Sequence, residues 1–231
     1  MNGILYGIGV GPGDPELMTI KAMKAIENSS IIILPSKTND YCYSYKIVKE
    51  VYPDIDKKNI VCFEFPMIKD KLKLKQAYDF IYNEVKLFLD EGHKIAFLTI
   101  GDPTVYSTYM YIHKRVMKDN FTCKIINGVP SFCAVAATLN ISLGERSDEI
   151  HIIPGSYDTK EALSYPGTKI FMKSGKQIEK LVNELKIALE DNDFEVYGVS
   201  NCGMVNEKIY LSINEMNDIK GYLTMVIVKE K

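Results

Sequence analysis

The stretch GIGVGPGD, residues 7–14, follows directly on an apolar run, Ile4–Gly9, that predicts a β-strand. It holds four glycines within eight residues, which lets the backbone turn sharply and lets a ligand approach the main chain closely. In open α/β sheets, ligands bind beside loops at the carboxyl ends of parallel strands. We therefore expect a ligand-facing loop here. The alternative is a rigid loop that only turns the chain.

The spacing of this loop excludes two familiar nucleotide-binding motifs. A dinucleotide fingerprint, G-x-G-x-x-G, would need glycine at position 12 or 14, where the chain has Pro12 and Asp14. The acidic residue expected after the second predicted strand is also missing, since that strand runs into PSK, residues 35–37. No Gly-Lys-Ser/Thr follows, so the loop is not a P-loop either. A different kind of ligand site is expected.

Beyond this loop, the first half of the chain alternates short apolar runs with amphipathic segments. Such alternation predicts βαβ units and a mainly parallel sheet, because parallel strands need a crossover connection. The predicted strands are Ile4–Gly9, Ile31–Leu34, Ile60–Phe63, Ile95–Ile100 and Thr122–Ile126. The predicted helices are Thr19–Glu27, Tyr43–Val51, Lys71–Asp90 and Tyr106–Met117.

The pattern changes at NGVPS, residues 127–131, where glycine and proline mark a turn and Ser131 can cap a helix over Phe132–Leu139. Near the carboxyl end, consecutive strands without helices between them predict antiparallel pairing. The predicted elements are strands Glu149–Ile153, Thr168–Met172, Glu195–Ser200, Lys208–Leu211 and Tyr222–Val228, and a helix Ile178–Leu189. We therefore expect two α/β domains, residues 1–127 with a mainly parallel sheet and residues 128–231 with a mixed sheet.

The composition narrows the possible partners. The chain has 231 residues, 46% hydrophobic and 25% charged, which excludes disorder as a description of the whole. Lys plus Arg is 28 and Asp plus Glu is 30, and the arginines are Arg115 and Arg146. A general nucleic-acid binder would show a basic excess, so no nucleic-acid partner is expected. An anionic ligand would have to be met by a local basic cluster.

Metal, disulfide and membrane roles are not expected either. The five cysteines form no C-x-x-C pair and the three histidines form no i,i+4 pair, so we predict neither a disulfide frame nor a protein-bound metal. The N-terminus lacks the basic and apolar regions of a signal peptide. The apolar runs fall far short of the ~20 residues that a membrane helix needs. A soluble cytoplasmic protein is expected.

Two further motifs could carry chemistry. GDPTVYST, residues 101–108, follows the fourth predicted strand and places a glycine and a carboxylate at a helix entrance. An ordinary Asp-Pro helix start is the alternative, because proline is favourable in the first turn. GVPSFCA, residues 128–134, lies at the predicted domain junction, and clefts between domains are common ligand sites. A linker followed by a helix of small residues is the alternative there.

Together these three motifs resemble those of the tetrapyrrole methylases, two-domain α/β enzymes that use S-adenosylmethionine (SAM) in the cleft between their domains. The resemblance rests on GIGVGPGDPELMT (7–19), GDPTVYST (101–108) and GVPSFCA (128–134), and it covers essentially the whole chain. Within that superfamily, GDPTVYSTY and the stretch 128–137, followed by LGE at 143–145, resemble the precorrin-2 and cobalt-precorrin-2 C20-methyltransferases.

The resemblance implies methyl transfer from SAM to C20 of the substrate in cobalamin biosynthesis, with S-adenosylhomocysteine as product and a homodimer as the assembly. It places SAM-binding groups at Gly101, Asp102, Pro103, Val105, Thr108, Ser131, Phe132, Met172 and Thr224. It places the first loop, with Gly11, Pro12 and Gly13, on the substrate side of the cleft. Arg146 and Lys173 are candidate substrate-binding residues by their loop positions, and Tyr106 either hydrogen-bonds a ligand or simply starts its helix. The alternatives are another member of the superfamily, acting on a different corrin intermediate, ribosomal RNA or protein, and a tetrapyrrole-binding module without catalysis.

A few residues have roles that the resemblance leaves open. Asp14 is the candidate general base, or else it fixes the first loop by capping a backbone N–H. The substrate implied by the resemblance carries eight carboxylates, and loop lysines such as Lys37 and Lys176 are possible anchors beside Arg146 and Lys173. Many family members have glycine at the position of Lys173. The lysine of this chain puts the family's local contact in doubt, and it would place an ammonium near a substrate carboxylate.

Overall fold

The computed structural model describes residues 3–66, 68, 70–190 and 192–230, apart from the side chain of Lys176. The chain divides into two compact units, Met1–Pro130 (unit 1) and Ser131–Lys231 (unit 2). The sequence pattern predicts this division after residue 127. Each unit has its own five-stranded sheet. No helix in the described ranges is long and apolar enough to cross a membrane.

The sheet of unit 1 is parallel throughout, as the alternating sequence pattern predicted. Its strands are β1 (Ile4–Gly9), β2 (Ile31–Leu34), β3 (Asn59–Cys62), β4 (Lys94–Thr99) and β5 (Thr122–Ile126). They are arranged in the order β3-β2-β4-β1-β5, and every neighbouring pair is parallel. The carboxyl ends of β1, β4 and β5 therefore meet at one edge, which is the edge where ligands bind in open α/β sheets.

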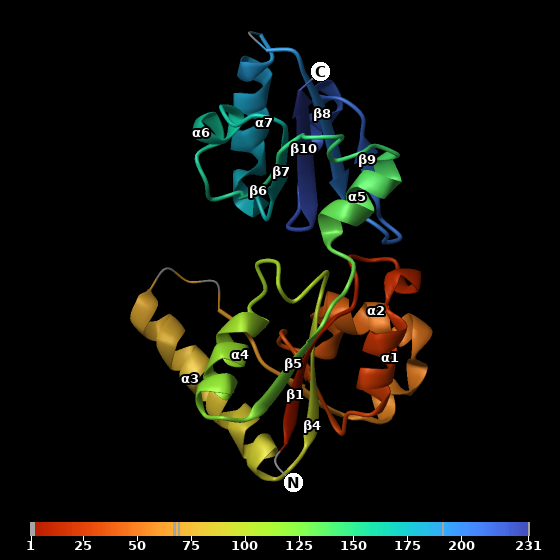
Figure 1. Ribbon diagram of the computed structural model, residues 1–231, viewed down its shortest axis with the longest axis vertical. Coiled ribbons are helices and arrows are strands. Elements are labelled where there is room, and N and C mark those ends of the chain that lie inside the picture. Colours follow the sequence, from red (N-terminus) through yellow and green to blue (C-terminus); the bar gives the residue numbers. More distant parts are fainter. Residues whose placement is uncertain (1–2, 67, 69, 191, 231) are drawn as a thin grey trace. The chain divides into compact units, whose positions relative to one another are not determined.

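Helices cover both faces of this sheet. They are α1 (Ile20–Glu27), α2 (Tyr43–Val51), α3 (Lys71–Asp90) and α4 (Tyr109–Lys118), with short 3₁₀ helices η1 (Pro15–Leu17), η2 (Asn39–Tyr41) and η3 (Pro53–Lys57). Figure 1 shows α1 and α2 on one face and α3 and α4 on the other. Successive side chains of a strand point to opposite faces, so Ile31 and Ile33 pack on the α3–α4 side while Ile32 and Leu34 pack on the α1–α2 side. This two-sided burial explains the continuous apolar run of β2.

The predicted helix Tyr106–Met117 begins later than expected. The structure starts α4 at Tyr109, so the predicted start is wrong. Tyr106 has a backbone φ of +47°, in the left-handed region that a right-handed helix cannot use. Residues 102–108 instead form a turn that starts with a hydrogen bond from the Val105 N–H to the Asp102 carbonyl.

Unit 2 has the mixed sheet that the sequence predicted. Its strands are β6 (Ile150–Pro154), β7 (Thr168–Met172), β8 (Phe194–Ser200), β9 (Lys208–Tyr210) and β10 (Thr224–Glu230), in the order β6-β7-β10-β8-β9. β6 and β7 are parallel, β10 is antiparallel to both β7 and β8, and β9 is antiparallel to β8. The carboxyl ends of β6, β7 and β8 and the amino end of β10 thus share one edge.

The helices of unit 2 are α5 (Ser131–Leu139), α6 (Thr159–Leu163) and α7 (Ile178–Ala188), with 3₁₀ helices η4 (Gly175–Gln177) and η5 (Ile213–Asp218). Figure 1 shows α6 and α7 on one face of the sheet and α5 on the other. The sequence pattern does not predict α6, which is only five residues long and begins after the capping side chain of Asp158. The predicted α7 ends one residue later than the observed one.

An ion pair between a buried lysine and a partly exposed glutamate joins the two strands β7 and β10. Lys169 on β7 has a fully buried side chain and pairs with Glu230 on β10 at 2.6 Å. The Lys169 ammonium also lies 5.0 Å from the centre of the Phe194 ring. Glu230 accepts a second hydrogen bond from the Gly167 N–H at 3.2 Å. The buried charge is thus compensated on several sides, as a buried charge must be.

Candidate functional site

The first loop and the GDP turn are joined through their backbones at the carboxyl edge of unit 1. Gly11 and Gly101 form an isolated antiparallel bridge. In it the Gly101 N–H donates to the Gly11 carbonyl at 2.7 Å, and the Gly11 N–H donates in return at 3.4 Å. The N–H of Val10 donates to the carbonyl of Thr99 at 3.0 Å. Two motifs about ninety residues apart in the sequence therefore form one structural element.

Three glycines bring the junction motif into the same contact. A Cβ added to Gly9 would lie 2.5 Å from the Gly101 oxygen and 2.6 Å from the Gly128 nitrogen. A Cβ added to Gly128 would lie 2.2 Å from the Gly101 oxygen. Gly101 itself has a φ of +69°, which favours glycine. These glycines are required because three main chains touch here with no room for side chains.

Asp102 ties the motifs together with its carboxylate. Its Oδ1 accepts hydrogen bonds from the N–H and the hydroxyl of Thr104 at 2.7 and 2.5 Å. Its Oδ2 accepts hydrogen bonds from the Asn127 side chain and the Gly128 N–H, both at 3.1 Å. Burial by itself would raise the pKa of Asp102, but these hydrogen bonds outweigh it and lower the pKa. The carboxylate is ionised and fully occupied, so a ligand at this turn would meet backbone groups.

The turn after Asp102 holds Tyr106 in an unusual conformation. Pro103 is buried, Val105 and Thr108 are half-buried, and the Tyr106 side chain is 46% exposed. The hydroxyls of Thr99 and Ser107 lie 3.0 Å apart, and the Ser107 hydroxyl accepts from the Tyr109 N–H at 3.2 Å. A bulky residue with positive φ is uncommon and is held there by its surroundings. The turn thus places a partly exposed tyrosine at the same edge.

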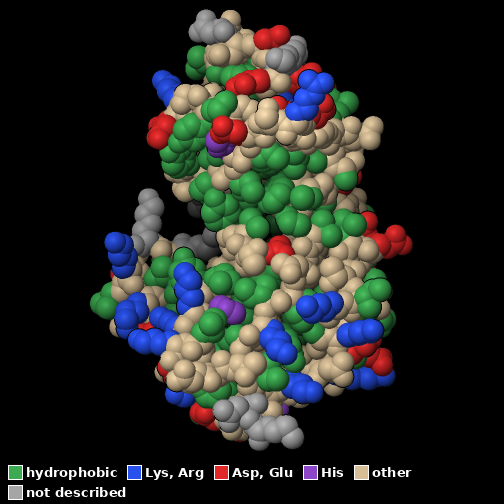
Figure 2. Space-filling view, viewed as in Figure 1, with side chains coloured by type: hydrophobic (Ala, Val, Ile, Leu, Met, Phe, Trp, Pro, Cys, Tyr) green, Lys and Arg blue, Asp and Glu red, His purple; other side chains and the backbone are tan. Residues whose placement is uncertain are grey.

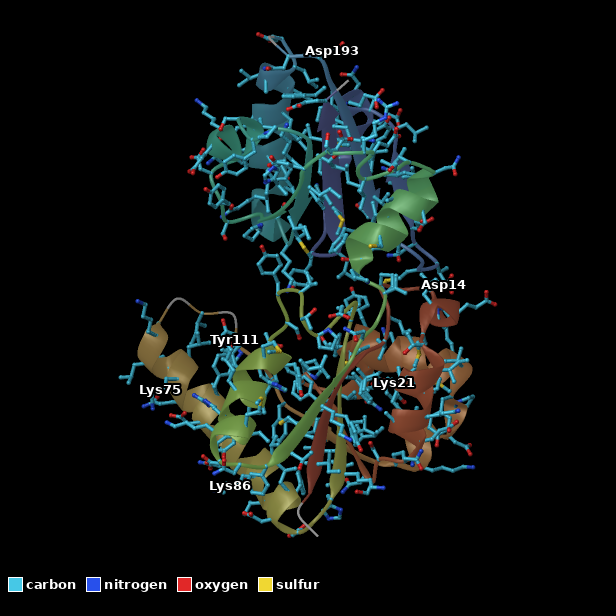
Figure 3. The ribbon with its side chains drawn as sticks, in the orientation of Figure 1. Asp14, Lys21, Lys75, Lys86, Tyr111 and Asp193 are labelled. Atoms are coloured by element: carbon cyan, nitrogen blue, oxygen red, sulfur yellow. The ribbon has the colours of Figure 1, made fainter. Side chains whose placement is uncertain are left out.

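Asp14 caps the short helix that follows the first loop. Its Oδ1 accepts a hydrogen bond from the Glu16 N–H at 2.8 Å. Figure 3 labels Asp14 at η1, at the end of unit 1 toward which β1 runs. Gly11, Pro12 and Gly13 before it are buried. This hydrogen bond supports the loop-fixing role, one of the two roles that the sequence left open.

Unit 2 also gathers predicted residues at one edge of its sheet. Met172 ends β7 and is buried, and Thr224 begins β10. Thr224 pairs in register with Ser200, and their hydroxyls lie 2.9 Å apart. Val226 pairs with Phe171, so the register places Thr224 level with Lys173. The sheet topology therefore brings the predicted SAM residues Met172 and Thr224 beside the predicted substrate residue Lys173.

The other predicted residues of unit 2 are spread more widely. Ser131 and Phe132 form the start of α5, and both are half-buried. Ser131 is the first residue of this helix and not the residue before it. Arg146 occupies a turn closed by a hydrogen bond from Asp148 to Glu145 and precedes the amino end of β6. The structure does not bring Arg146 to the edge of Lys173, which lies at the carboxyl ends of β6 and β7.

The remaining lysine candidates are less informative. Lys37 forms an exposed ion pair with Glu64 at 3.3 Å, so its charge is compensated within unit 1. The side chain of Lys176 lies outside the described part of the chain. Figure 2 shows basic side chains over α3 and α4, and there Lys75 and Arg115 pair with Asp79. That basic surface is therefore partly neutralised by its own carboxylate.

Two features of the edge of unit 2 were missed by the sequence analysis. Tyr222 precedes β10 by two residues, and burial raises the pKa of its phenol. Ser200, at the end of β8, bonds to Thr224. The pattern along the chain gave no signal for either residue, because β10 follows β9 in the sequence but lies between β7 and β8 in the sheet. Within the described ranges, no group of three or more His, Cys, Asp and Glu residues could hold a metal ion.

Comparison with known proteins gives a consistent family assignment. The model of the family described as Tetrapyrrole (Corrin/Porphyrin) Methylases matches residues 4–216. The probable cobalt-precorrin-2 C(20)-methyltransferase of Methanocaldococcus jannaschii is 34% identical over 230 residues, covering 97% of this chain and 95% of that protein. The cobalt-precorrin-2 C(20)-methyltransferase of Salmonella typhimurium is 25% identical over 244 residues, covering 100% of this chain and 98% of that protein.

Solved structures show the same fold. The cobalt precorrin-4 methyltransferase CbiF has a TM-score of 0.74 at 20% identity, covering 98% of this chain and 94% of that one. The uroporphyrin-III C-methyltransferase of Thermus thermophilus, complexed with S-adenyl homocysteine, has a TM-score of 0.71 at 17% identity, covering 99% of this chain and 98% of that one. The predicted two-domain α/β fold, with a parallel and a mixed sheet, is thereby confirmed.

Proposed function

Because the chain belongs to the tetrapyrrole (corrin/porphyrin) methylases, we propose that it is a SAM-dependent methyltransferase acting on C20 of precorrin-2 or cobalt-precorrin-2 in cobalamin biosynthesis. Relatives named for this reaction match over nearly the whole chain. The observation that carries the proposal within the structure is the meeting of Gly9, Gly101 and Gly128 at one sheet edge. The three motifs that carry the family resemblance thus form one site element.

The residues present fit SAM, which supplies an electrophilic methyl group when bound. The carboxylate of Asp102 is occupied by internal hydrogen bonds, so the turn offers backbone groups to the amino-acid part of SAM. The proposal assigns Val105 and Thr108 to the border of the SAM site. In unit 2 it assigns Met172 and Thr224, which share an edge, to the adenosine part, and it gives contacts also to Ser131 and Phe132.

In this reaction the protein's main role is to position the two reactants, and it does not need to supply a nucleophile. The electron-rich ring carbon attacks the methyl group, so no side chain needs to form a covalent bond. In-line alignment of the two reacting atoms provides most of the rate enhancement in reactions of this kind. Excluding water helps as well, because positive charge on sulfur disappears as the methyl group leaves it. The rigid glycine contact and the clamped turn at Asp102 suit this positioning role.

A methyl-transfer assay tests the proposal. The purified protein is incubated with tritiated-methyl SAM and anaerobically prepared precorrin-2 or its cobalt form. We expect label in a trimethylated tetrapyrrole, and the faster of the two substrates identifies whether cobalt is already present. Label found only in ribosomal RNA or protein would show that the enzyme has another activity of the superfamily. Tetrapyrrole binding without any methyl transfer would make it a binding module.

Asp14→Asn separates the two roles of that residue. The amide oxygen of asparagine can still accept from the Glu16 N–H, but the side chain can no longer take up a proton. We expect unfolding in urea to be unchanged within about 0.5 kcal/mol and the rate of methyl transfer to stay within about threefold of the wild type. General-base catalysis is worth roughly 10²–10⁴ in rate. A loss of that size with unchanged stability would make Asp14 the base that removes the C20 proton.

The proposal also includes a cytoplasmic homodimer, as the family resemblance implies. Sedimentation at micromolar concentration tests the assembly. We expect a species of twice the chain mass of 26.2 kDa. A monomer that is active at the same concentration would contradict the homodimer while leaving the activity in place.

A further inference from the structure

The carboxyl edge of the sheet in unit 2 is basic. It is formed by residues 154–157 after β6, 172–175 after β7, 200–203 after β8 and 220–224 at the start of β10. By sequence these segments contain Lys173 and Lys220 and no aspartate or glutamate. Two carboxylates adjoin them: Glu207 accepts a hydrogen bond from the Gly203 N–H at 2.7 Å, and Asp158 caps α6. An anion that approaches these segments meets the lysine charges, while the two adjoining carboxylates already accept hydrogen bonds from backbone N–H groups.

The carboxyl edge in unit 1 has the opposite character. Two of its carboxylates, Asp14 and Asp102, accept hydrogen bonds from neighbouring N–H groups. Lys37, which follows β2, is paired with Glu64 after β3. Backbone contacts between glycines form most of the rest. This edge suits a neutral or cationic group better than a carboxylate.

Lys173, at this edge, has an unusual backbone conformation. Its φ is +56°, in the left-handed region where a side chain other than that of glycine or asparagine is strained. The turn imposes this conformation: the Gly155 N–H donates to the Met172 carbonyl at 2.8 Å, and the Gln177 N–H donates to the Ser174 carbonyl at 2.7 Å. A Cβ on Gly155 would also lie 2.2 Å from Ser174 Cα, so the two backbones are in close contact.

A glycine at position 173 would meet the demands of this turn without strain. A lysine there destabilises the fold, and such strain persists where the residue has a use. Its side chain still reaches solvent, yet surrounding atoms desolvate the ammonium and lower its pKa. A partly desolvated ammonium interacts more strongly with an incoming carboxylate than one in bulk water does.

We infer that Lys173 is a specificity-determining residue that binds a carboxylate of the anionic tetrapyrrole, and that unit 2 supplies this recognition. The inference rests on the proposed function for the class of ligand. It predicts that affinity depends on the number of carboxylates on the macrocycle and that this dependence weakens without the ammonium.

Three variants separate charge from backbone strain. Lys173→Gly removes both, Lys173→Met removes the charge and keeps the strain, and Lys173→Arg keeps both. The probes are uroporphyrin III, an octacarboxylate, and coproporphyrin III, a tetracarboxylate, titrated by absorbance at low and moderate salt. S-adenosylhomocysteine binding, measured by calorimetry, and thermal unfolding are followed in parallel. Lys124→Met, at an exposed position in the middle of β5, is the control for removing a lysine elsewhere.

We expect Lys173→Gly to melt about 3 °C above the wild type because the strain is relieved. It should bind uroporphyrin about tenfold more weakly, with a smaller preference over coproporphyrin. Lys173→Met should show the same loss without the gain in melting temperature, and Lys173→Arg and Lys124→Met should bind within threefold of the wild type. S-adenosylhomocysteine affinity should stay within twofold in all variants.

Two results would overturn the inference. Unchanged preference for uroporphyrin in both Lys173→Gly and Lys173→Met would show that Lys173 meets no carboxylate. A lower melting temperature of Lys173→Gly together with weaker S-adenosylhomocysteine binding would show that lysine is there for structure. Failure of the proposed function is a separate outcome. In that case the wild type would not methylate precorrin-2, but the Lys173 variants would still bind uroporphyrin more weakly than the wild type does.

Discussion

Replacing Gly128 with alanine is expected to destabilise unit 1 by about 3 kcal/mol and to abolish SAM binding. The new Cβ would lie 2.2 Å from the Gly101 oxygen and 2.8 Å from the Gly9 carbonyl carbon. Both are backbone atoms, one in the turn after β4 and one at the end of β1, so no side chain can rotate away. Relief would require β5 to move from β1 and would break the hydrogen bond from Gly128 to Asp102.

Urea unfolding, followed by tyrosine fluorescence, measures the first effect, and calorimetry with S-adenosylhomocysteine measures the second. Gly144→Ala is the matched control, because the atoms nearest to its Cβ would be side-chain atoms of Ile150, at 3.2 Å, and of Asp148. We expect that control to cost less than about 1 kcal/mol. Equal stability of the two variants would contradict the close contact of Gly128 with Gly101 and Gly9.

Asp102→Asn is the second substitution with a large expected effect. The carboxylate accepts on both oxygens, from Thr104 on one side and from Asn127 and Gly128 on the other. Asparagine replaces one oxygen with an NH₂ group, which would face N–H or O–H donors in either orientation. A buried donor without an acceptor costs about 1–3 kcal/mol. We expect a loss of about 3 kcal/mol in the free energy of unfolding and at least tenfold weaker binding of S-adenosylhomocysteine.

The pH dependence identifies the carboxylate as the cause. The pKa of Asp102 is lower in the folded chain than the ordinary value of 3.8, so its ionisation stabilises the fold fully above that value. This contribution is lost as the pH falls through the lower, folded-state pKa. The difference in urea midpoint between wild type and Asp102→Asn should therefore be largest near neutral pH and shrink below about pH 4.

Asp70→Asn is the control for this second experiment. Asp70 caps α3 by accepting from the N–H groups of Leu72 and Lys73. Asparagine caps helices about as well as aspartate does, so we expect little change. A difference for Asp102→Asn that is independent of pH would contradict the assigned role of the ionised carboxylate.

Local patterns were enough to predict most of the fold. The strands Ile4–Gly9 and Ile31–Leu34 and the helix Lys71–Asp90 have the predicted bounds, because each is long or uniformly apolar and ends at a glycine or a polar turn. The late start of α4 was missed because the side chain of Asp102 and the left-handed Tyr106 decide it, and neither changes the hydrophobic spacing. The short α6 was missed because five residues carry too little periodicity.

The candidate site was predictable only in part. The glycine motifs of unit 1 predict close backbone contacts, and in the structure these motifs do contact one another. The grouping of Met172, Lys173 and Thr224 depends on strand order, which no local pattern reveals. The same holds for Arg146, which precedes β6 and is kept away from Lys173 by the direction of that strand. The individual binding roles of all these residues stay predictions.

The position of β10 in its sheet has a consequence for the order in which the protein forms during synthesis. β10 leaves the ribosome after β6, β7, β8 and β9, yet it pairs with both β7 and β8 and supplies Glu230 to the buried Lys169. Unit 2 therefore cannot close its sheet until β10 has emerged. Unit 1 has all its strands by residue 126 and can fold while unit 2 is still being translated. A nascent chain stalled before β10 should therefore contain a protease-resistant unit 1 followed by a protease-sensitive segment.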